Sequence, residues 1–65
     1  MEHTIELARI DQRRSLVLWV TNSGHRQFVV CSYYNPTVPV GEQWSWGHYF
    51  DDLFDAVEYA KGELA

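Results

Sequence analysis

The sequence predicts an α+β domain in which a four-stranded antiparallel meander sheet carries one C-terminal helix on one face (β-β-β-β-α). Three observations predict it. Short apolar stretches with strand-like spacing recur as far as residue 50, the connections between the first three are short and polar, and the apolar spacing becomes helical after Asp51. Because short connections join antiparallel neighbours, we expect successive strands to lie side by side. All 65 residues are expected to form this single domain.

The first two strands are predicted over residues 3–10 and 15–21. In the first, Ile5 and Leu7 alternate with polar residues, as in a strand with one buried face. The second is apolar on both faces, which is typical of a central strand. The polar residues 11–14 between them are expected to form a hairpin loop.

The third strand is predicted over residues 25–34 and the fourth over about 43–49. Asn22-Ser23-Gly24 is typical of a tight turn in which Gly24 has a positive φ. Residues 35–41 contain both prolines and a glycine and are therefore expected to be a loop.

A helix is predicted after Asp51 because the apolar residues fall on one helical stripe. The stripe consists of Leu53, Ala56, Val57, Ala60 and Leu64. Asp51 or Asp52 is expected to cap the first turn. Gly62 is expected to end the helix, with Lys61 in its last turn.

The lengths of the two turns predict the register of the first three strands. The predicted opposite pairs are Ile5 with Val20, Leu7 with Leu18, Leu18 with Phe28, and Leu16 with Val30. Both turns assign these residues to the same face of the sheet, which we expect the helix to cover. Trp44, Trp46 and Phe50 share a parity in the fourth strand and are expected to extend that core.

One helix covers only one face of a four-stranded sheet, so the other face is expected to stay open. Its central residues are apolar or aromatic: Val17, Trp19, Val29 and Tyr33. Leaving such side chains in water forfeits roughly 1.5–3 kcal/mol each. We therefore predict that these four residues bind a protein partner or a second copy of the chain. Strand pairing at a sheet edge is another route to a dimer.

The alternative function is binding of single-stranded nucleic acid. Trp19 and Tyr33 can stack on bases. Three arginines near the hairpin ends can contact phosphates: Arg13, Arg14 and Arg26. The net charge of −4 and the acidic C-terminal segment repel phosphates, so the sequence favours a protein partner.

Ser45, His48 and Asp51 or Asp52 have the residue types of a hydrolytic site. The sequence has no Gly-x-Ser-x-Gly elbow, and a small sheet offers few walls for a substrate pocket. His48 is expected instead to be a polar residue at the junction between the last strand and the helix. We expect no enzymatic activity and no catalytic residue.

The candidate metal ligands are His3, His25, Cys31 and His48, but their spacings match no zinc pattern. A single cysteine cannot form an internal disulfide. We expect Cys31 to be a small buried or half-buried hydrophobe rather than a reactive thiol. No metal or other cofactor is expected, and a reducing cytoplasm is the natural setting.

The composition excludes two classes of protein. Hydrophobic residues make up 46% of the chain and charged residues 22%, which is not the composition of a disordered segment. The longest wholly apolar run, Leu16 to Val20, is too short to span a bilayer. The first residues contain no basic region leading into an apolar stretch, so no signal peptide is expected.

The C-terminal third contains a recognisable pattern. Trp44-Ser45-Trp46-Gly47-His48-Tyr49-Phe50 is followed by an acidic segment with an Asp55-Ala56 pair. This resembles small proteins of Firmicutes and their phages or mobile elements, which have a Trp-x-x-Gly-x-Tyr-Phe segment leading into a short helix. The resemblance implies an accessory protein that binds a larger partner. It implies no catalytic or ligand-binding residue.

Overall fold

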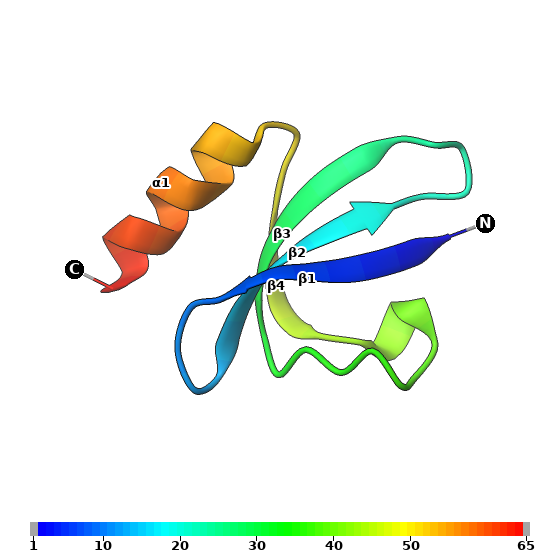
Figure 1. The fold of residues 1–65 in the computed structure, drawn as a ribbon, viewed down its shortest axis with the longest axis horizontal. Coiled ribbons are helices and arrows are strands. Elements are labelled where there is room, and N and C mark those ends of the chain that lie inside the picture. Colours follow the sequence, from blue (N-terminus) through cyan, green and yellow to red (C-terminus); the bar gives the residue numbers. More distant parts are fainter. Residues whose placement is uncertain (1, 65) are drawn as a thin grey trace.

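The computed structural model describes residues 2–64, and the side chains of residues 2–62. Its four strands form one antiparallel sheet in the order β1-β2-β3-β4, followed by one helix (Figure 1). The predicted α+β fold class is confirmed. The elements are β1 (His3–Arg9), β2 (Arg14–Val20), β3 (Arg26–Ser32), a 3-10 turn (Val40–Glu42), β4 (Ser45–Phe50) and α1 (Leu53–Leu64).

Both hairpin turns form where the sequence predicts them. Gly24 has a φ of 87°, and its N–H donates to the carbonyl of Thr21 at 2.9 Å. In the first turn, Asp11 Oδ1 accepts the backbone N–H of Arg13 at 2.9 Å and that of Arg14 at 2.7 Å. An Asp side chain that bonds its own following backbone in this way is what stabilises a polar turn.

The register between β2 and β3 is as predicted, but that between β1 and β2 differs. Leu18 lies opposite Phe28, whereas Ile5 lies opposite Leu18 instead of Val20. A bulge at Leu7 interrupts the pairing between β1 and β2. Because Ile5 is displaced by two residues, and side chains alternate with a period of two, it remains on the predicted face.

Helix α1 covers one face of β2, β3 and β4. Asp52 Oδ1 accepts the N–H of Phe54 at 2.9 Å, so Asp52 is the N-cap. The helix continues through Gly62, which was expected to end it, because a glycine costs a helix only about 1 kcal/mol. Leu53 is exposed rather than buried, and the side chain of Leu64 lies outside the described residues. The core on this face consists of Ile10, Leu16, Phe28, Val30, Phe50, Ala56, Val57, Tyr59 and Ala60.

The opposite face is covered by residues 33–44, which we call the cover segment. In Figure 1 this segment runs across the side of the sheet away from α1. Tyr34 and Trp44 of the cover segment pack against a buried cluster on the sheet. That cluster consists of Val17, Val29 and Cys31. The sheet is therefore enclosed from both sides, by a helix and by an irregular segment.

Polar side chains hold the cover segment in place. Gln43 is buried; its Nε2 donates to the carbonyl of Val38 at 2.8 Å, and its Oε1 accepts the hydroxyl of Thr4. Thr4 also bonds the hydroxyl of Tyr34 at 2.8 Å, and the N–H of Asn35 donates to the Gln43 carbonyl at 2.7 Å. Because these hydrogen-bond donors and acceptors pair with one another, the cover segment can lie on the sheet without leaving these polar groups unpaired.

The prediction that Trp44 and Trp46 join the helix-side core with Phe50 is right only for Phe50. Trp44 lies on the other face, and Trp46 is exposed. The cause is a bulge in β4 between the pairs Val30–His48 and Ser32–Ser45. One extra residue in a strand reverses the faces of the residues before it.

Candidate functional site

The residues predicted to form an open binding face lie in two different environments. Val17 and Val29 are 0% exposed beneath the cover segment, so they cannot contact a partner. The prediction that this face is open is therefore wrong. Residues 35–41 were expected to form only a connecting loop, and Tyr34 and Trp44 to lie in the flanking strands. Both strands are shorter than predicted, and these two side chains pack on the sheet from the irregular segment between them.

Trp19 is half-buried and belongs to an aromatic cluster. Its ring lies edge-on to Trp44, with centroids 5.8 Å apart, and to Tyr49 at 6.1 Å. Its Nε1 donates to the carboxylate of Glu2 at 3.0 Å. Trp19 is thus held by several neighbours rather than standing free on the sheet.

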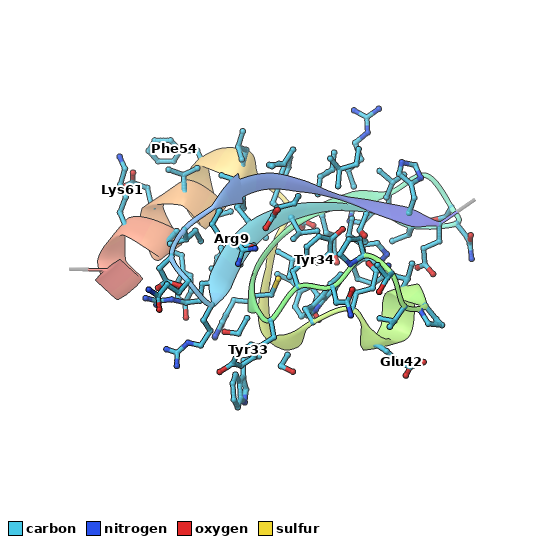
Figure 2. The ribbon with its side chains drawn as sticks, turned by 60° about the horizontal axis from the view of Figure 1, so that its bottom comes forward. Arg9, Tyr33, Tyr34, Glu42, Phe54 and Lys61 are labelled. Carbon is cyan, nitrogen blue, oxygen red and sulfur yellow. The ribbon has the colours of Figure 1, made fainter. Side chains whose placement is uncertain are left out.

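Tyr33 is exposed, as predicted, and its neighbour is Trp46. The two ring centroids are 6.0 Å apart, and the side chains are 58% and 71% exposed. In Figure 2 Tyr33 lies at the outer edge of the molecule, whereas Tyr34 lies between the strands and the cover segment. We call Tyr33 and Trp46 the exposed aromatic pair.

Both members of the exposed aromatic pair have an unusual backbone conformation. Tyr33 has a φ of 58° and Trp46 a φ of 52°. Bulky residues rarely adopt this left-handed region, which costs on the order of 1–3 kcal/mol at each position. Trp46 is the first of two residues, Trp46 and Gly47, that face Cys31 in the β4 bulge. Bulges of this kind re-aim a side chain, and here the ring is aimed at solvent.

Gly47 makes the bulge possible. A Cβ at this position would lie 2.7 Å from Nε1 of Trp44 and 2.8 Å from the hydroxyl of Tyr49. These two atoms are joined by a hydrogen bond of 2.8 Å directly beside the glycine. The exposure of Trp46 differs from the prediction that it joins the core, although a glycine inside a strand is itself a signal of a bulge.

Two of the three predicted arginines lie beside the exposed aromatic pair. The N–H of Tyr33 donates to the carbonyl of Arg13 at 2.7 Å, which fixes the first turn against the end of β3. Arg26 begins β3 and lies at the other end of that strand. The structure therefore brings together Arg13 and Arg14 and separates Arg26 from them.

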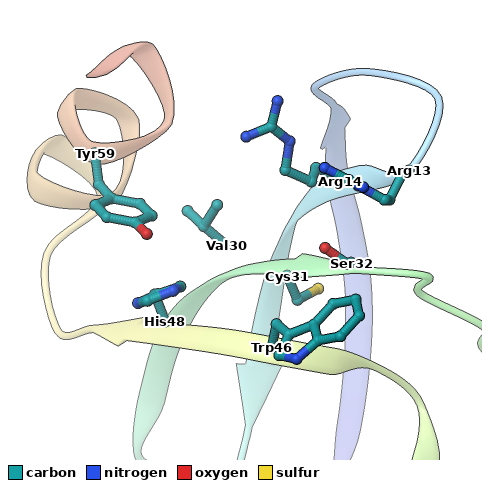
Figure 3. A pocket seen from close by; sticks show the side chains of 8 residues that line it. All are labelled: Arg13, Arg14, Val30, Cys31, Ser32, Trp46, His48 and Tyr59. Atoms are coloured by element: carbon teal, nitrogen blue, oxygen red, sulfur yellow. The ribbon is translucent and has the colours of Figure 1, made fainter. Parts of the chain in front are cut away.

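A pocket of about 190 Å³ opens between the two arginines, the helix and β4 (Figure 3). Arg13 and Arg14 lie on one side of it, Tyr59 of α1 faces them, and His48 and Trp46 rise from β4. Val30, Cys31 and Ser32 of β3 complete the lining. We call it the arginine pocket.

The two arginines differ in their electrostatic state. Asp11 accepts bonds from Nε and Nη2 of Arg14, the former at 2.8 Å. These bonds, together with those from the backbone of Arg13 and Arg14, hold the pKa of Asp11 well below its usual range. The Arg14 charge is therefore paired. In the described part of the chain, the guanidinium of Arg13 makes no ion pair, so it can bind an anionic group.

The residues of the imagined hydrolytic site make other contacts. The ring of His48 packs against that of Tyr59, with centroids 4.7 Å apart and planes inclined by 36°. Asp51 contacts Nε2 of His25 at 3.2 Å, and Asp52 caps α1. Within residues 2–64, no cluster of three His, Cys, Asp or Glu side chains is arranged to hold a metal ion.

Cys31 is buried, as predicted. Burial, and secondarily the carboxylate of Glu6, raises the pKa of its thiol to about 11. The thiol therefore stays protonated at neutral pH and is a poor nucleophile. Its Sγ–H faces the carbonyl of Ser15 at 3.8 Å.

Comparisons with known proteins add no relative. No protein-family model, curated protein or solved structure matches the chain. In the residues described, no helix has the length and apolar character needed to cross a bilayer.

Proposed function

We propose that this protein is a non-catalytic protein-binding module whose contact surface is the exposed aromatic pair together with Arg13. The observation that carries the proposal is that two bulky aromatic residues occupy strained backbone conformations in order to point at solvent. Strained backbone conformations cluster at functional sites. Trp, Tyr and Arg are also the residue types most enriched in the energetic centres of protein interfaces.

The surface favours a partner segment with two features. The rings of Tyr33 and Trp46 offer an apolar platform, which suits an apolar or aromatic side chain. The unpaired guanidinium of Arg13 lies next to it and suits a carboxylate, which it can bind in a bidentate manner. The resemblance to accessory proteins of phages and mobile elements is compatible with such a role and stays a prediction.

Single-stranded nucleic acid is the second candidate, because an exposed aromatic pair beside an arginine is also a stacking platform. The charges argue against it. Arg14 is paired with Asp11, Arg26 lies at the far end of β3, and the net charge is −4. One free guanidinium neutralises too few phosphates to hold a strand against this field.

The test compares Trp46→Gly with Phe54→Ser, which removes an equally exposed aromatic ring from α1. Glycine adopts a positive φ freely, so we expect Trp46→Gly to leave stability unchanged or to raise it by up to about 1 kcal/mol. Binding should be lost, whereas Phe54→Ser should bind normally. Urea unfolding measures the first effect, and affinity capture followed by calorimetry with the purified partner measures the second.

Three results would contradict the proposal. Trp46→Gly could destabilise the fold by more than about 1 kcal/mol, which would make Trp46 a packing residue. The variant could also capture the same proteins as the wild type. Finally, the protein could bind added single-stranded DNA with an affinity that falls steeply as the salt concentration rises. That result would assign the surface to nucleic acid.

A further inference from the structure

We propose that a second site, formed by the aromatic cluster around Trp19, binds a small organic cation with a quaternary ammonium group. The site is a hollow of about 250 Å³ at the edge of the cover segment. Its lining consists of Glu2, Trp19, Val40, Gly41, Trp44, Trp46, Gly47 and Tyr49. We call it the aromatic cup. It does not depend on the protein-binding function proposed above, although Trp46 borders both sites.

Three rings of the aromatic cup pack against one another and form one wall of the hollow. The centroids of Trp19, Trp44 and Tyr49 are 5.8, 6.1 and 6.2 Å apart, and the planes are inclined by 54–70°. A cation is attracted to an aromatic ring when it lies within about 6 Å of the centroid. A cation held in the hollow lies against this aromatic wall and beside the carboxylate of Glu2.

The indole N–H groups of the two inner tryptophans are already engaged. Nε1 of Trp19 donates to Glu2, and Nε1 of Trp44 donates to the hydroxyl of Tyr49 at 2.8 Å. The cup therefore offers a ligand its ring surfaces and the carboxylate of Glu2. Such a surface attracts positive charge and provides few hydrogen-bond partners.

Charge and size define the class of ligand. Among the described residues that line the cup, Glu2 carries a negative charge and none is a lysine or arginine. A phosphate next to the ammonium group would therefore find no counter-charge. A primary ammonium needs several acceptors for its three N–H groups, whereas a quaternary ammonium needs none and places methyl groups against the rings. The volume is below the roughly 300–1,000 Å³ of pockets for drug-sized ligands, so it suits one such headgroup.

The first test is a titration of the whole chain with choline, followed by tryptophan fluorescence and by NMR of the indole N–H signals. Three matched probes change one property each. 3,3-Dimethyl-1-butanol keeps the shape of choline and removes its charge, ethanolamine removes its methyl groups, and phosphocholine adds a phosphate. We expect saturable binding of choline, with each of the other three bound at least about tenfold more weakly.

A pair of variants tests the role of the carboxylate. Glu2→Gln keeps the size of the side chain and its ability to accept the bond from Trp19, but removes the charge. Glu58→Gln removes the same charge from the exposed side of α1 and controls for the change in net charge. We expect choline to bind Glu2→Gln at least threefold more weakly and Glu58→Gln with unchanged affinity.

The proposal is overturned if choline does not saturate the indole signals, if the uncharged isostere binds as well as choline, or if the two Gln variants weaken binding equally. The comparison of choline with its isostere uses the wild-type chain and does not depend on the folding of any variant. Tyr33→Ser separates the two proposals, because it alters the protein-binding surface and leaves the lining of the aromatic cup intact. Choline binding should survive this substitution.

Discussion

The helix-covered face of the sheet and the face beneath the cover segment differ in how completely they exclude water. Beneath the cover segment, Val17 and Val29 are wholly buried. On the helix side Ala56 is also wholly buried, but Ile5 of β1 remains 48% exposed, and an apolar hollow of about 220 Å³ opens between Ala8 of β1 and α1. A 12-residue helix is too short to cover four strands, whereas an irregular segment can follow the sheet's surface.

A helix and an irregular segment differ in how their polar groups find hydrogen-bond partners when they cover a sheet. A helix satisfies its own backbone polar groups, so α1 needs only an apolar stripe. The cover segment has no such internal pattern, and it depends on the buried amide of Gln43 together with Thr4 and Tyr34. Removing the packing or the polar network of this segment should therefore cost more than changing the exposed parts of the helix.

The largest expected effect is that of Trp44→Ala. This change removes the ring that packs over the buried cluster and its bond to Tyr49, so it should lower the free energy of unfolding by about 3 kcal/mol. The matched change on the helix, Phe54→Ala, removes an exposed ring and should cost less than about 0.5 kcal/mol. Urea unfolding measures both. Equal effects would mean that the cover segment adds little to stability.

A smaller effect is expected at high pH from Cys31. Its folded pKa of about 11 lies above the value of about 8.5 for an unfolded chain, so stability is retained below pH 8 and falls as the pH rises from 9 to 11. The wild type should lose about 2 kcal/mol at pH 10 relative to Cys31→Ala. Unfolding curves of both proteins from pH 7 to 10.5 test this. Parallel curves would show that water reaches the thiol beneath the cover segment.

The smallest effect has the opposite sign and concerns the helix. Gly62 lies within α1, and a Cβ at this position would meet no atom within 4 Å. Gly62→Ala should therefore raise the free energy of unfolding by about 0.5 kcal/mol, because alanine loses less backbone entropy on folding. A melting temperature that falls would indicate that the end of α1 needs the flexibility of glycine.

Much of the fold could be predicted because it depends on local rules. Gly24 defines the second turn, Asp52 caps the helix, and the alternation of Leu16 and Leu18 assigns them to the helix side. The position of Trp46 could not be derived by counting residues, because one extra residue in β4 reverses the parity that the counting assumes. The bulge at Leu7 likewise changed the partners of β1: Ile5 keeps its predicted face, whereas Ala8, beyond the bulge, pairs with Leu16 on the helix side.

The candidate site was predicted only in part. Tyr33, Arg13 and Arg14 do lie together on the surface, but Val17 and Val29 are buried, Trp19 belongs to the aromatic cup, and Arg26 is remote. The missing element was Trp46, whose ring completes the exposed aromatic pair. Its exposure depends on the pairing of β4 with β3, which involves residues distant in the sequence.

The sequence by itself determined the order of the elements, the face of most strand residues and the ends of the turns, because these follow from periodicity and from the conformational preferences of neighbouring residues. Only the tertiary structure decided that residues 33–44 cover the second face, since that contact joins Gln43 to Thr4 and Trp44 to Trp19 across long sequence separations. A segment without regular structure carries no periodic signal. Its position is set by which buried polar groups find partners when the whole chain has folded.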